Sequence, residues 1–145
     1  QWRDFDFDVF FQGIGKKDVV LGGNQFWGFG NEWHVPFKHA LDSWTEDNRN
    51  AYFPRSTYDN VTGNRETQTR YLQNAAYLRL KSITLGYSLP KALLGKWKID
   101  HVRFYVSGQN LLTFDHLFDI YDPETVSLST YPLTKSVSFG LNITL

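Results

Sequence analysis

The sequence contains no cysteine and no methionine, and it carries no net charge. Without cysteine the protein has neither disulfides nor thiol chemistry, which suits an exported protein that avoids thiols. Lysine and arginine number 15, as do aspartate and glutamate, so no overall field attracts an anionic membrane surface, and no nucleic acid partner is predicted. Because methionine is missing even from position 1, we expect the C-terminal part of a longer protein.

Long hydrophobic runs are also missing, since no apolar stretch approaches the roughly 20 residues of a membrane-spanning helix. If the chain crosses a membrane, it must do so with strands closed into a barrel. What the sequence has in excess is aromatic residues, which make up 17% of its 145 positions. Such enrichment occurs on carbohydrate-binding surfaces and in the interfacial girdles of outer-membrane barrels, and both classes stay open at this point.

Four segments alternate apolar with polar residues at a period of two, which predicts β-strands at 5–12, 76–89, 102–114 and 136–145. In the first segment carboxylates stand directly between phenylalanines, so the face opposite the apolar one must be wet. The fold class is therefore all-β, and the strands belong either to a soluble core or to a transmembrane barrel. The polar positions that would face the lumen of a barrel are Asp6, Asp8, Arg103, Tyr105 and Gln109.

The connections between these strands alternate long, short and long, as barrel topology requires. Segments 13–73 and 115–134 show no sustained period, apart from a weak helix signal from Lys38 to Trp44. A structureless segment as long as the first is unusual in a compact domain, but it is expected of the extracellular loops of outer-membrane barrels. The connection 90–101 is predicted to be a short periplasmic turn that holds one turn of helix.

Two charges interrupt the apolar face of the second strand, because Arg79 and Lys81 share parity with its apolar residues. A lipid-facing Arg or Lys costs about 2 to 4 kcal/mol at the bilayer midplane and close to nothing at the interface. Either this end of the strand stands above the hydrocarbon, or a bulge near Ser82 turns both charges to the other face. We favour the first interpretation. A bulge near Gly108 or an exit of the third strand from the membrane is also predicted, since Asn110 falls on the apolar face of this strand and Leu111 on the polar one.

The long first loop holds the functional candidates, a group of aromatic residues that would be exposed. They could stack on a sugar or grip a peptide, and they could equally pack the loop on itself or contact a lid protein. We favour packing or partner contact over ligand contact. The group consists of Trp27, Trp33, Trp44, Tyr52, Phe53 and Tyr58.

No catalytic residue, metal site or cofactor is predicted, so we expect a protein that is not an enzyme. Asp6 and Asp8 are spaced too regularly along one strand to form an acid–base pair. The histidines are scattered and lack the spacing of zinc ligands. Acidic side chains of the second long loop could offer oxygen ligands to calcium, but the spaced loop with a central glycine is missing, which favours a solvated acidic loop. These side chains are Asp115, Asp119, Asp122 and Glu124.

Several motifs occur in an order that is typical of one family. They are NAAYLRLKSITLGYSLP, KALLGK, VRFYVSGQNLLTF, YDPE and the terminal SFGLNITL, preceded by FDFDVFFQGIGKKDV and WTEDNRNAYFPR. In this order they strongly resemble the C-terminal end of SusC-like TonB-dependent outer-membrane transporters, the starch-utilisation and RagA class. The resemblance covers nearly the whole chain.

The resemblance implies an antiparallel transmembrane barrel of about 22 strands with long extracellular loops. This chain would supply the last four strands, with the plug domain upstream and the C-terminus on the periplasmic side of the bacterial outer membrane. The implied function is import of oligosaccharides or peptides. The implied partners are a SusD-like surface lipoprotein, the TonB complex acting through upstream segments, and the barrel assembly machinery. The terminal strand also resembles the signal that this machinery recognises, with its key positions at Ser138, Gly140, Ile143 and Leu145.

The rival interpretation is a secreted β-sandwich module that binds carbohydrate, which would also have alternating strands and many aromatic residues. Such a module would be soluble without detergent and would need no residues before Gln1. The two interpretations therefore differ in what covers the apolar face, which is lipid in the barrel and the protein's own core in the sandwich.

Overall fold

The computed structural model describes residues 3–28, 33, 35–57, 63–95, 99–131 and 133–145. The chain divides into two compact units, each described by itself below. The sheet unit comprises Gln1–Lys17 and Ala75–Leu145, and the loop unit comprises Asp18–Asn74. No helix within the described ranges is long and apolar enough to cross a bilayer.

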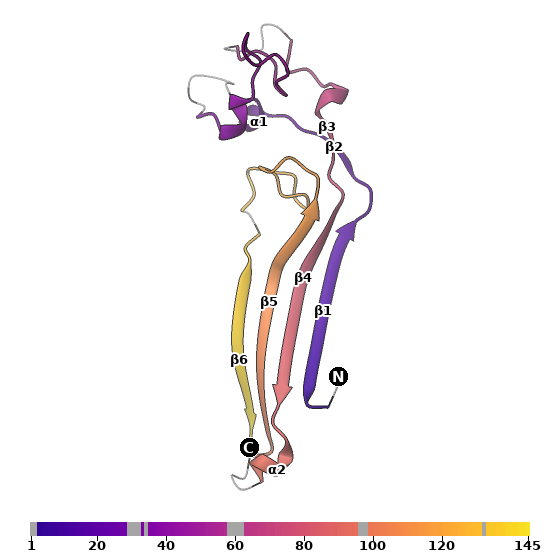
Figure 1. The fold of residues 1–145 in the computed structure, drawn as a ribbon, viewed down its shortest axis with the longest axis vertical. Coiled ribbons are helices and arrows are strands. Elements are labelled where there is room, and N and C mark those ends of the chain that lie inside the picture. Colours follow the sequence, from indigo (N-terminus) through magenta and orange to yellow (C-terminus); the bar gives the residue numbers. More distant parts are fainter. Residues whose placement is uncertain (1–2, 29–32, 34, 58–62, 96–98, 132) are drawn as a thin grey trace. The chain divides into compact units, whose positions relative to one another are not determined.

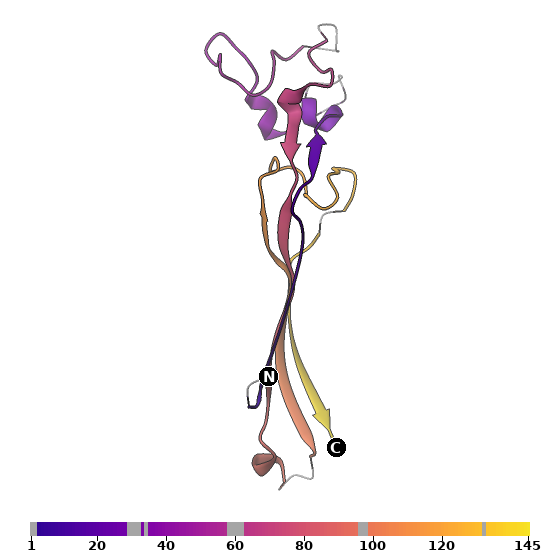
Figure 2. The same ribbon diagram turned by 90° about the vertical axis from the view of Figure 1, so that its right-hand side faces the viewer.

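The sheet unit contains one antiparallel sheet of four strands, in the order β1-β4-β5-β6 (Figure 1). The strands are β1 (Phe5–Ile14), β4 (Tyr77–Ser88), β5 (His101–Asp115) and β6 (Ser136–Thr144). The short helix α2 (Lys91–Leu94) lies in the connection between β4 and β5. In the view of Figure 2, which is turned by 90°, the strands cross one another because the sheet is twisted.

The strand register assigns the strand residues to two faces, because residues opposite each other in neighbouring strands point the same way. One face, called the apolar face, has no charged residue in the described strands. It includes Phe5, Phe7, Val9, Phe11, Leu80, Ile83, Leu85, Tyr87, Phe104, Val106, Leu112, Val137, Phe139 and Leu141. The opposite face, called the polar face, includes Asp6, Asp8, Arg79, Thr84, Arg103, Tyr105, Ser107, Gln109, Ser138 and Asn142.

A bulge in β4 removes two charges from the apolar face. Adjacent residues of β1 pair with Ser82 and Leu80, so Lys81 is an extra residue in β4. The extra residue shifts the alternation by one position, and Arg79 therefore lies on the polar face. Our preference for charges that stay on the apolar face above the hydrocarbon is wrong, and the alternative of a bulge near Ser82 is confirmed.

Strand β5 carries a second irregularity, because two of its residues, Asn110 and Leu111, lie opposite the single residue Lys81. Asn110 adopts a φ of 52°, in the left-handed region that asparagine enters more readily than most residues. A Cβ placed on Gly108 would come within 2.5 Å of the Leu111 side chain, so Leu111 covers the apolar face at this point. The predicted bulge near Gly108 is thus confirmed, at the residues that follow this glycine.

The loop unit contains short elements where the sequence shows no period. β2 (Asp18–Val20) pairs antiparallel with β3 (Leu72–Asn74), and between them lie α1 (Asn24–Trp27) and the 3-10 helices η1 (Lys38–Leu41) and η2 (Thr69–Tyr71). The predicted helix signal near η1 therefore corresponds to a single turn. We expected a segment without secondary structure. The structure differs from this expectation, because the two ends of the segment pair with each other as β2 and β3. The buried apolar residues of the unit are Leu21, Phe26, Ala40, Ala51, Phe53 and Tyr71.

Candidate functional site

The polar face of the sheet holds all the residues that the sequence predicts for a lumen wall. Asp6 and Tyr105 lie on either side of Gly86 in one row across the sheet. Asp8 and Gln109 lie in the next two rows on the same face. In these rows small residues of β4 lie between β1 and β5. The structure thus brings these side chains onto one surface, and that this surface lines a lumen stays a prediction.

An ion pair crosses the sheet on this face. The Nε atom of Arg103 donates to Oδ1 of Asp6 at 2.9 Å, and a second bond joins Nη2 to Oδ2. The pair spans β4 over Gly86, where a Cβ would come within 2.3 Å of the carboxylate and 2.6 Å of the guanidinium. The guanidinium carbon also lies 5.2 Å from the centre of the Tyr105 ring. Only glycine at this position lets strands two apart form a bidentate pair.

Tyr105 and Gly140 repeat this arrangement at the pair β5–β6. They lie opposite each other, and a Cβ on Gly140 would fall within 2.1 Å of the Tyr105 ring. The Tyr105 ring therefore lies directly over the glycine. Side chains on the polar face lean across their neighbours in this way, which makes the face a packed polar layer.

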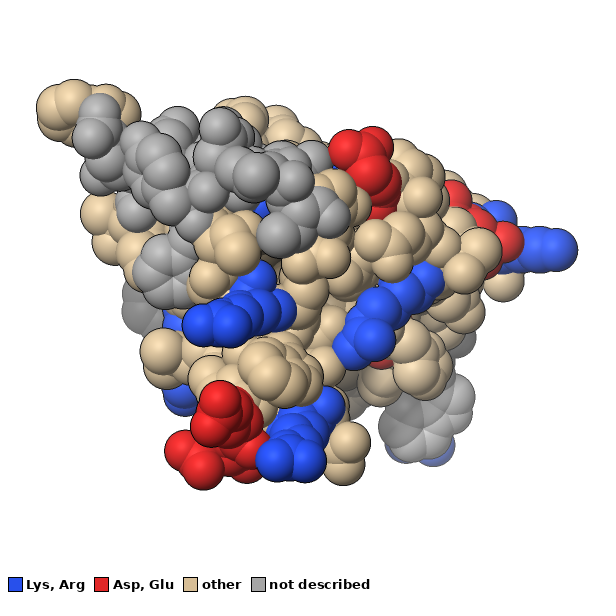
Figure 3. Space-filling view, turned by 90° about the horizontal axis from the view of Figure 1, so that it is seen from above, with Lys and Arg blue, Asp and Glu red and all other residues tan. Residues whose placement is uncertain are grey.

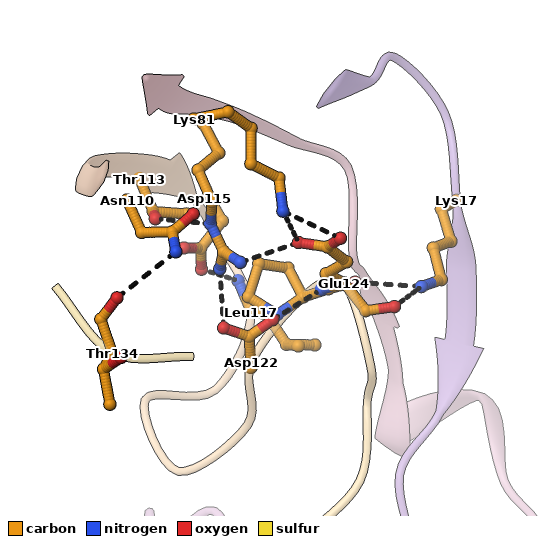
Figure 4. Close-up of polar contacts among 11 residues, drawn as sticks. Lys17, Lys81, Asn110, Thr113, Asp115, Leu117, Asp122, Glu124 and Thr134 are labelled. Atoms are coloured by element: carbon orange, nitrogen blue, oxygen red, sulfur yellow. Dashed lines mark hydrogen bonds and ion pairs between the residues drawn. The ribbon is translucent and has the colours of Figure 1, made fainter. Parts of the chain in front are cut away.

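A cluster of charges attaches the β5–β6 connection to the sheet (Figure 4). Arg79 donates to Asp122 Oδ2 at 2.6 Å and to Glu124 Oε2 at 2.8 Å. Lys81 Nζ donates to both oxygens of Glu124, at 3.0 and 2.8 Å. Lys17 Nζ reaches the backbone of the same segment. We call Lys17, Arg79, Lys81, Asp122 and Glu124 the loop-anchoring cluster.

Arg79 is the centre of this cluster, with a side chain only 3% exposed. A buried guanidinium must be paired, because an unpaired buried charge loses its hydration without compensation. Nε completes the set by donating to Thr113 Oγ1 at 2.9 Å. Our expectation of a solvated acidic loop is therefore wrong for Asp122 and Glu124, which hold Arg79 and Lys81. Among the described residues no group of three acidic, histidine or cysteine side chains is placed to hold a metal ion.

Aromatic side chains form the core of the loop unit, and three predicted candidates belong to it. Trp27 packs edge to face on Tyr71 at 4.7 Å between ring centres, and Tyr52 does so on Phe53 at 4.9 Å. Phe26 is fully buried and packs on Phe53 at 5.1 Å. Burial raises the pKa of the Tyr71 hydroxyl above its ordinary value. These contacts favour internal packing for Trp27, Tyr52 and Phe53.

The other three candidates lie elsewhere. Trp33 is 85% exposed and Trp44 is 36% exposed, whereas Tyr58 lies outside the described residues. Ligand or partner contact by any of the six stays a prediction.

Sequence reasoning missed two features of the candidate site. It assigned Arg79 to the apolar face, although two charges at one end of an otherwise apolar strand were themselves a signal for a bulge. It also missed Phe26 and His39, whose Nε2 lies 2.9 Å from the Phe26 carbonyl oxygen. No local signal marks either residue, because their partners are distant in the sequence.

Comparison with known proteins gives relatives in both sequence and structure, although no family model matches. The chain is 28% identical over 158 residues to TonB-dependent receptor P3 of Formosa agariphila, and 26% identical over 159 residues to TonB-dependent receptor P26 of the same organism. Each match covers 99% of this chain but only 15% and 16% of the respective relative. The chain therefore spans less than a fifth of the length of the curated relatives it matches.

Solved structures of the RagAB peptide importer are among the structural neighbours. The closed-closed state gives a TM-score of 0.71 at 28% identity, covering 98% of this chain and 16% of that chain. The open-open state gives 0.69 at 28% identity, covering 99% and 16%. The likeness confirms the predicted fold class, an all-β antiparallel segment of a barrel. The matched proteins are named as receptors and importers, which agrees with a role other than catalysis.

Proposed function

Because this chain is a SusC/RagA-like TonB-dependent transporter segment in sequence and in structure, we propose that it forms part of a barrel wall in the bacterial outer membrane. The whole protein would import oligosaccharides or peptides and would not be an enzyme. In this arrangement the apolar face of the sheet meets lipid, and the polar face lines the lumen.

The observation that carries the proposal is the apolar face. Its side chains are large and exposed, with Phe7 exposed by 60% and Phe139 by 80%. A soluble monomer rarely exposes a continuous apolar surface that extends over four strands. The strands have 10, 12, 15 and 9 residues, and a tilted strand needs about 9 to 11 to cross the hydrocarbon. Lipid is therefore the environment that fits this face best.

The connections suggest which end of the sheet faces outward. Ile14, Tyr77 and Asp115 lie in one row, so the two long connections leave the sheet at the same end. The short connection with α2 lies at the other end, beside the end of β6. Long loops are extracellular and short turns periplasmic in such barrels, which supports a periplasmic C-terminus. The same end would hold the proposed assembly signal of Ser138, Gly140, Ile143 and Leu145, recognised by the barrel assembly machinery.

The proposed partners follow from the relatives. Likeness to the RagAB importer supports a SusD-like surface lipoprotein as partner, and the receptor names support energy supply through TonB, contacted by segments outside this chain. The RagAB name supports peptides as cargo, whereas the aromatic content of the loop unit supports oligosaccharides. Both cargo classes belong to the proposal.

A charge scan of β4 in the full-length protein tests the lipid-facing assignment. Leu85→Arg on the apolar face should cost about 2 to 4 kcal/mol and reduce the folded, heat-modifiable protein in outer-membrane fractions. The matched control Thr84→Arg places the same charge on the polar face near Asp8, where we expect normal levels. Equal levels for the two variants, or full-length protein that is monodisperse without detergent, would contradict the proposal and favour the secreted β-sandwich.

A further inference from the structure

The loop unit has a cleft whose lining is unusually basic. Its volume is about 360 Å³, which lies within the range of small-molecule sites. Three arginines line it together with Trp44, and the apolar residues Phe53 and Tyr71 form part of its wall. No aspartate or glutamate is among the lining residues that the structure describes. The three arginines are Arg49, Arg55 and Arg70.

None of these arginines forms an ion pair within the described residues. Arg70 is held in place by backbone carbonyls, since Nη2 donates to Ala51 at 2.7 Å and Nε donates to Tyr52 at 3.0 Å. Arg49 donates through Nε to the carbonyl of Glu46 at 3.1 Å. Carbonyls fix these side chains without neutralising them, so positive charge gathers at the cleft.

Of the three arginines, Arg55 has the fewest described polar contacts. In the described part of the chain no hydrogen bond or ion pair involves its guanidinium, although it lines this cleft and a second hollow of about 370 Å³. Figure 3 shows Lys and Arg side chains both near the middle and at the margins of one face, and Asp and Glu side chains at its margins. A guanidinium with unused donors in such a setting suits a bidentate bond to a carboxylate.

Trp44 differs from the other aromatic residues of the cleft. Phe53 and Tyr71 pack against rings of the core, whereas no aromatic contact of Trp44 occurs among the described residues. Its backbone N–H donates to the carbonyl of Phe53 at 3.0 Å, which fixes the backbone. The indole lines both hollows and is 36% exposed. An accessible indole on a fixed backbone presents a flat apolar surface to a ligand.

We propose that this cleft binds a uronic-acid residue of an acidic oligosaccharide. The sugar ring stacks on Trp44, and the carboxylate bonds to Arg55 with Arg49 and Arg70 supplying further positive charge. A uronate carries its carboxylate directly on a pyranose ring, whose C–H face can stack on an indole, so one unit satisfies both the indole and the guanidinium. An acidic peptide would satisfy the guanidinium but would cover the indole only with a flexible side chain. The inference rests on the oligosaccharide branch of the proposed function.

The test is calorimetric titration of the full-length protein in detergent with trigalacturonate. We expect binding that weakens as salt is raised and no binding of neutral maltotriose. Arg55→Gln should weaken binding roughly tenfold or more, because a charge-assisted bond is lost. Trp44→Ala should weaken it as well. The matched control is Lys38→Gln, which removes one positive charge from the same unit away from the cleft and should leave binding unchanged.

Three outcomes would overturn the site. They are equal affinity of wild type and Arg55→Gln for trigalacturonate, equal loss in Lys38→Gln, and tighter binding of triglutamate than of trigalacturonate with the same dependence on Arg55. Failure of the transporter assignment is measured separately, by outer-membrane fractionation of the wild type. Protein that inserts into the outer membrane but does not bind trigalacturonate would therefore refute the site alone.

Discussion

The sheet unit and the loop unit both contain several phenylalanines, but they differ in whether the side chains are exposed or buried. Phe7 and Phe139 of the sheet unit are 60% and 80% exposed, whereas Phe26 and Phe53 of the loop unit are 0% and 4% exposed. The loop unit buries Phe26, Phe53 and Tyr71 against other aromatic rings, as a protein in water does. The sheet unit exposes Phe7 and Phe139 on its apolar face. The exposure of phenylalanine thus indicates the environment of each unit. This environment is water for the loop unit and, by our proposal, lipid for the apolar face of the sheet unit.

Polar groups complete the contrast. In the sheet unit they gather on one face and satisfy one another, as Arg103 does with Asp6 and Arg79 with Asp122. In the loop unit Arg70 bonds to backbone carbonyls, and the charge of Arg55 has no described partner. A wet but enclosed surface favours internal pairing, whereas a surface open to ligands leaves donors available.

The largest effect should come from the terminal strand, which tests the sheet side of the comparison. Deleting Ile143 to Leu145 removes part of the apolar row and the end of the proposed assembly signal, so we expect loss of most folded protein from outer-membrane fractions. Ile143→Asp should cost about 1 to 3 kcal/mol and reduce the level less. Asn142→Ser on the polar face is the control. Normal levels for the deletion would remove the strongest support for lipid on this face.

Phe26→Ala should unfold the loop unit while leaving the sheet unit folded. Truncating a fully buried phenylalanine costs about 3 to 5 kcal/mol, and this loss falls on the small aromatic core. Hydrogen exchange should become faster at β2 and β3 but not at β4 and β5. Leu41→Ala, at a residue 78% exposed, should change neither. Faster exchange throughout the chain would mean that the two units unfold as one.

Arg79→Met tests whether the loop-anchoring cluster holds the β5–β6 connection. The variant leaves two partly buried carboxylates without their main partner, at a cost of about 3 kcal/mol. Proteases added to intact cells should then cleave between residues 116 and 135. Lys81→Gln is the milder comparison, because Lys81 is more exposed and Glu124 keeps Arg79, so a change of about 1 kcal/mol or less is expected. Unchanged protease resistance of Arg79→Met would show that other contacts hold this segment.

A smaller effect than that of Arg79→Met is expected for Gly140→Ala, which tests the packing on the polar face. The added methyl meets the Tyr105 ring, and overpacking of this kind costs about 1 to 3 kcal/mol. The temperature at which heat-modifiable protein unfolds should fall accordingly. Tyr105→Ala in the same chain should relieve the clash. A loss of folded protein that the second change does not restore would point to the assembly signal as the cause.

Much of the sheet unit could be predicted from its sequence, because the alternation of apolar and polar residues is local. Phe5, Phe7 and Val9 fall on one face whatever strand lies beside them. The predicted strands overlap the observed ones, and the predicted polar residues share one face. In the loop unit no comparable period exists. Trp27 and Phe53 could be selected as notable residues, but their packing against Phe26 and Tyr71 could not, since it depends on where the chain returns.

By itself the sequence determined that one face of each strand is apolar and the other polar. Successive side chains of a strand point to opposite faces whichever strand pairs with it. Only the tertiary structure decided between the two interpretations of Arg79 and Lys81. A bulge at Lys81 exists because the neighbouring strands set the register of β4 on both sides. The burial of Arg79 likewise depends on Asp122 and Glu124, which lie 43 and 45 residues away. Contacts over such separations leave no local pattern, because their stability comes from pairing that exists only once the strands are aligned.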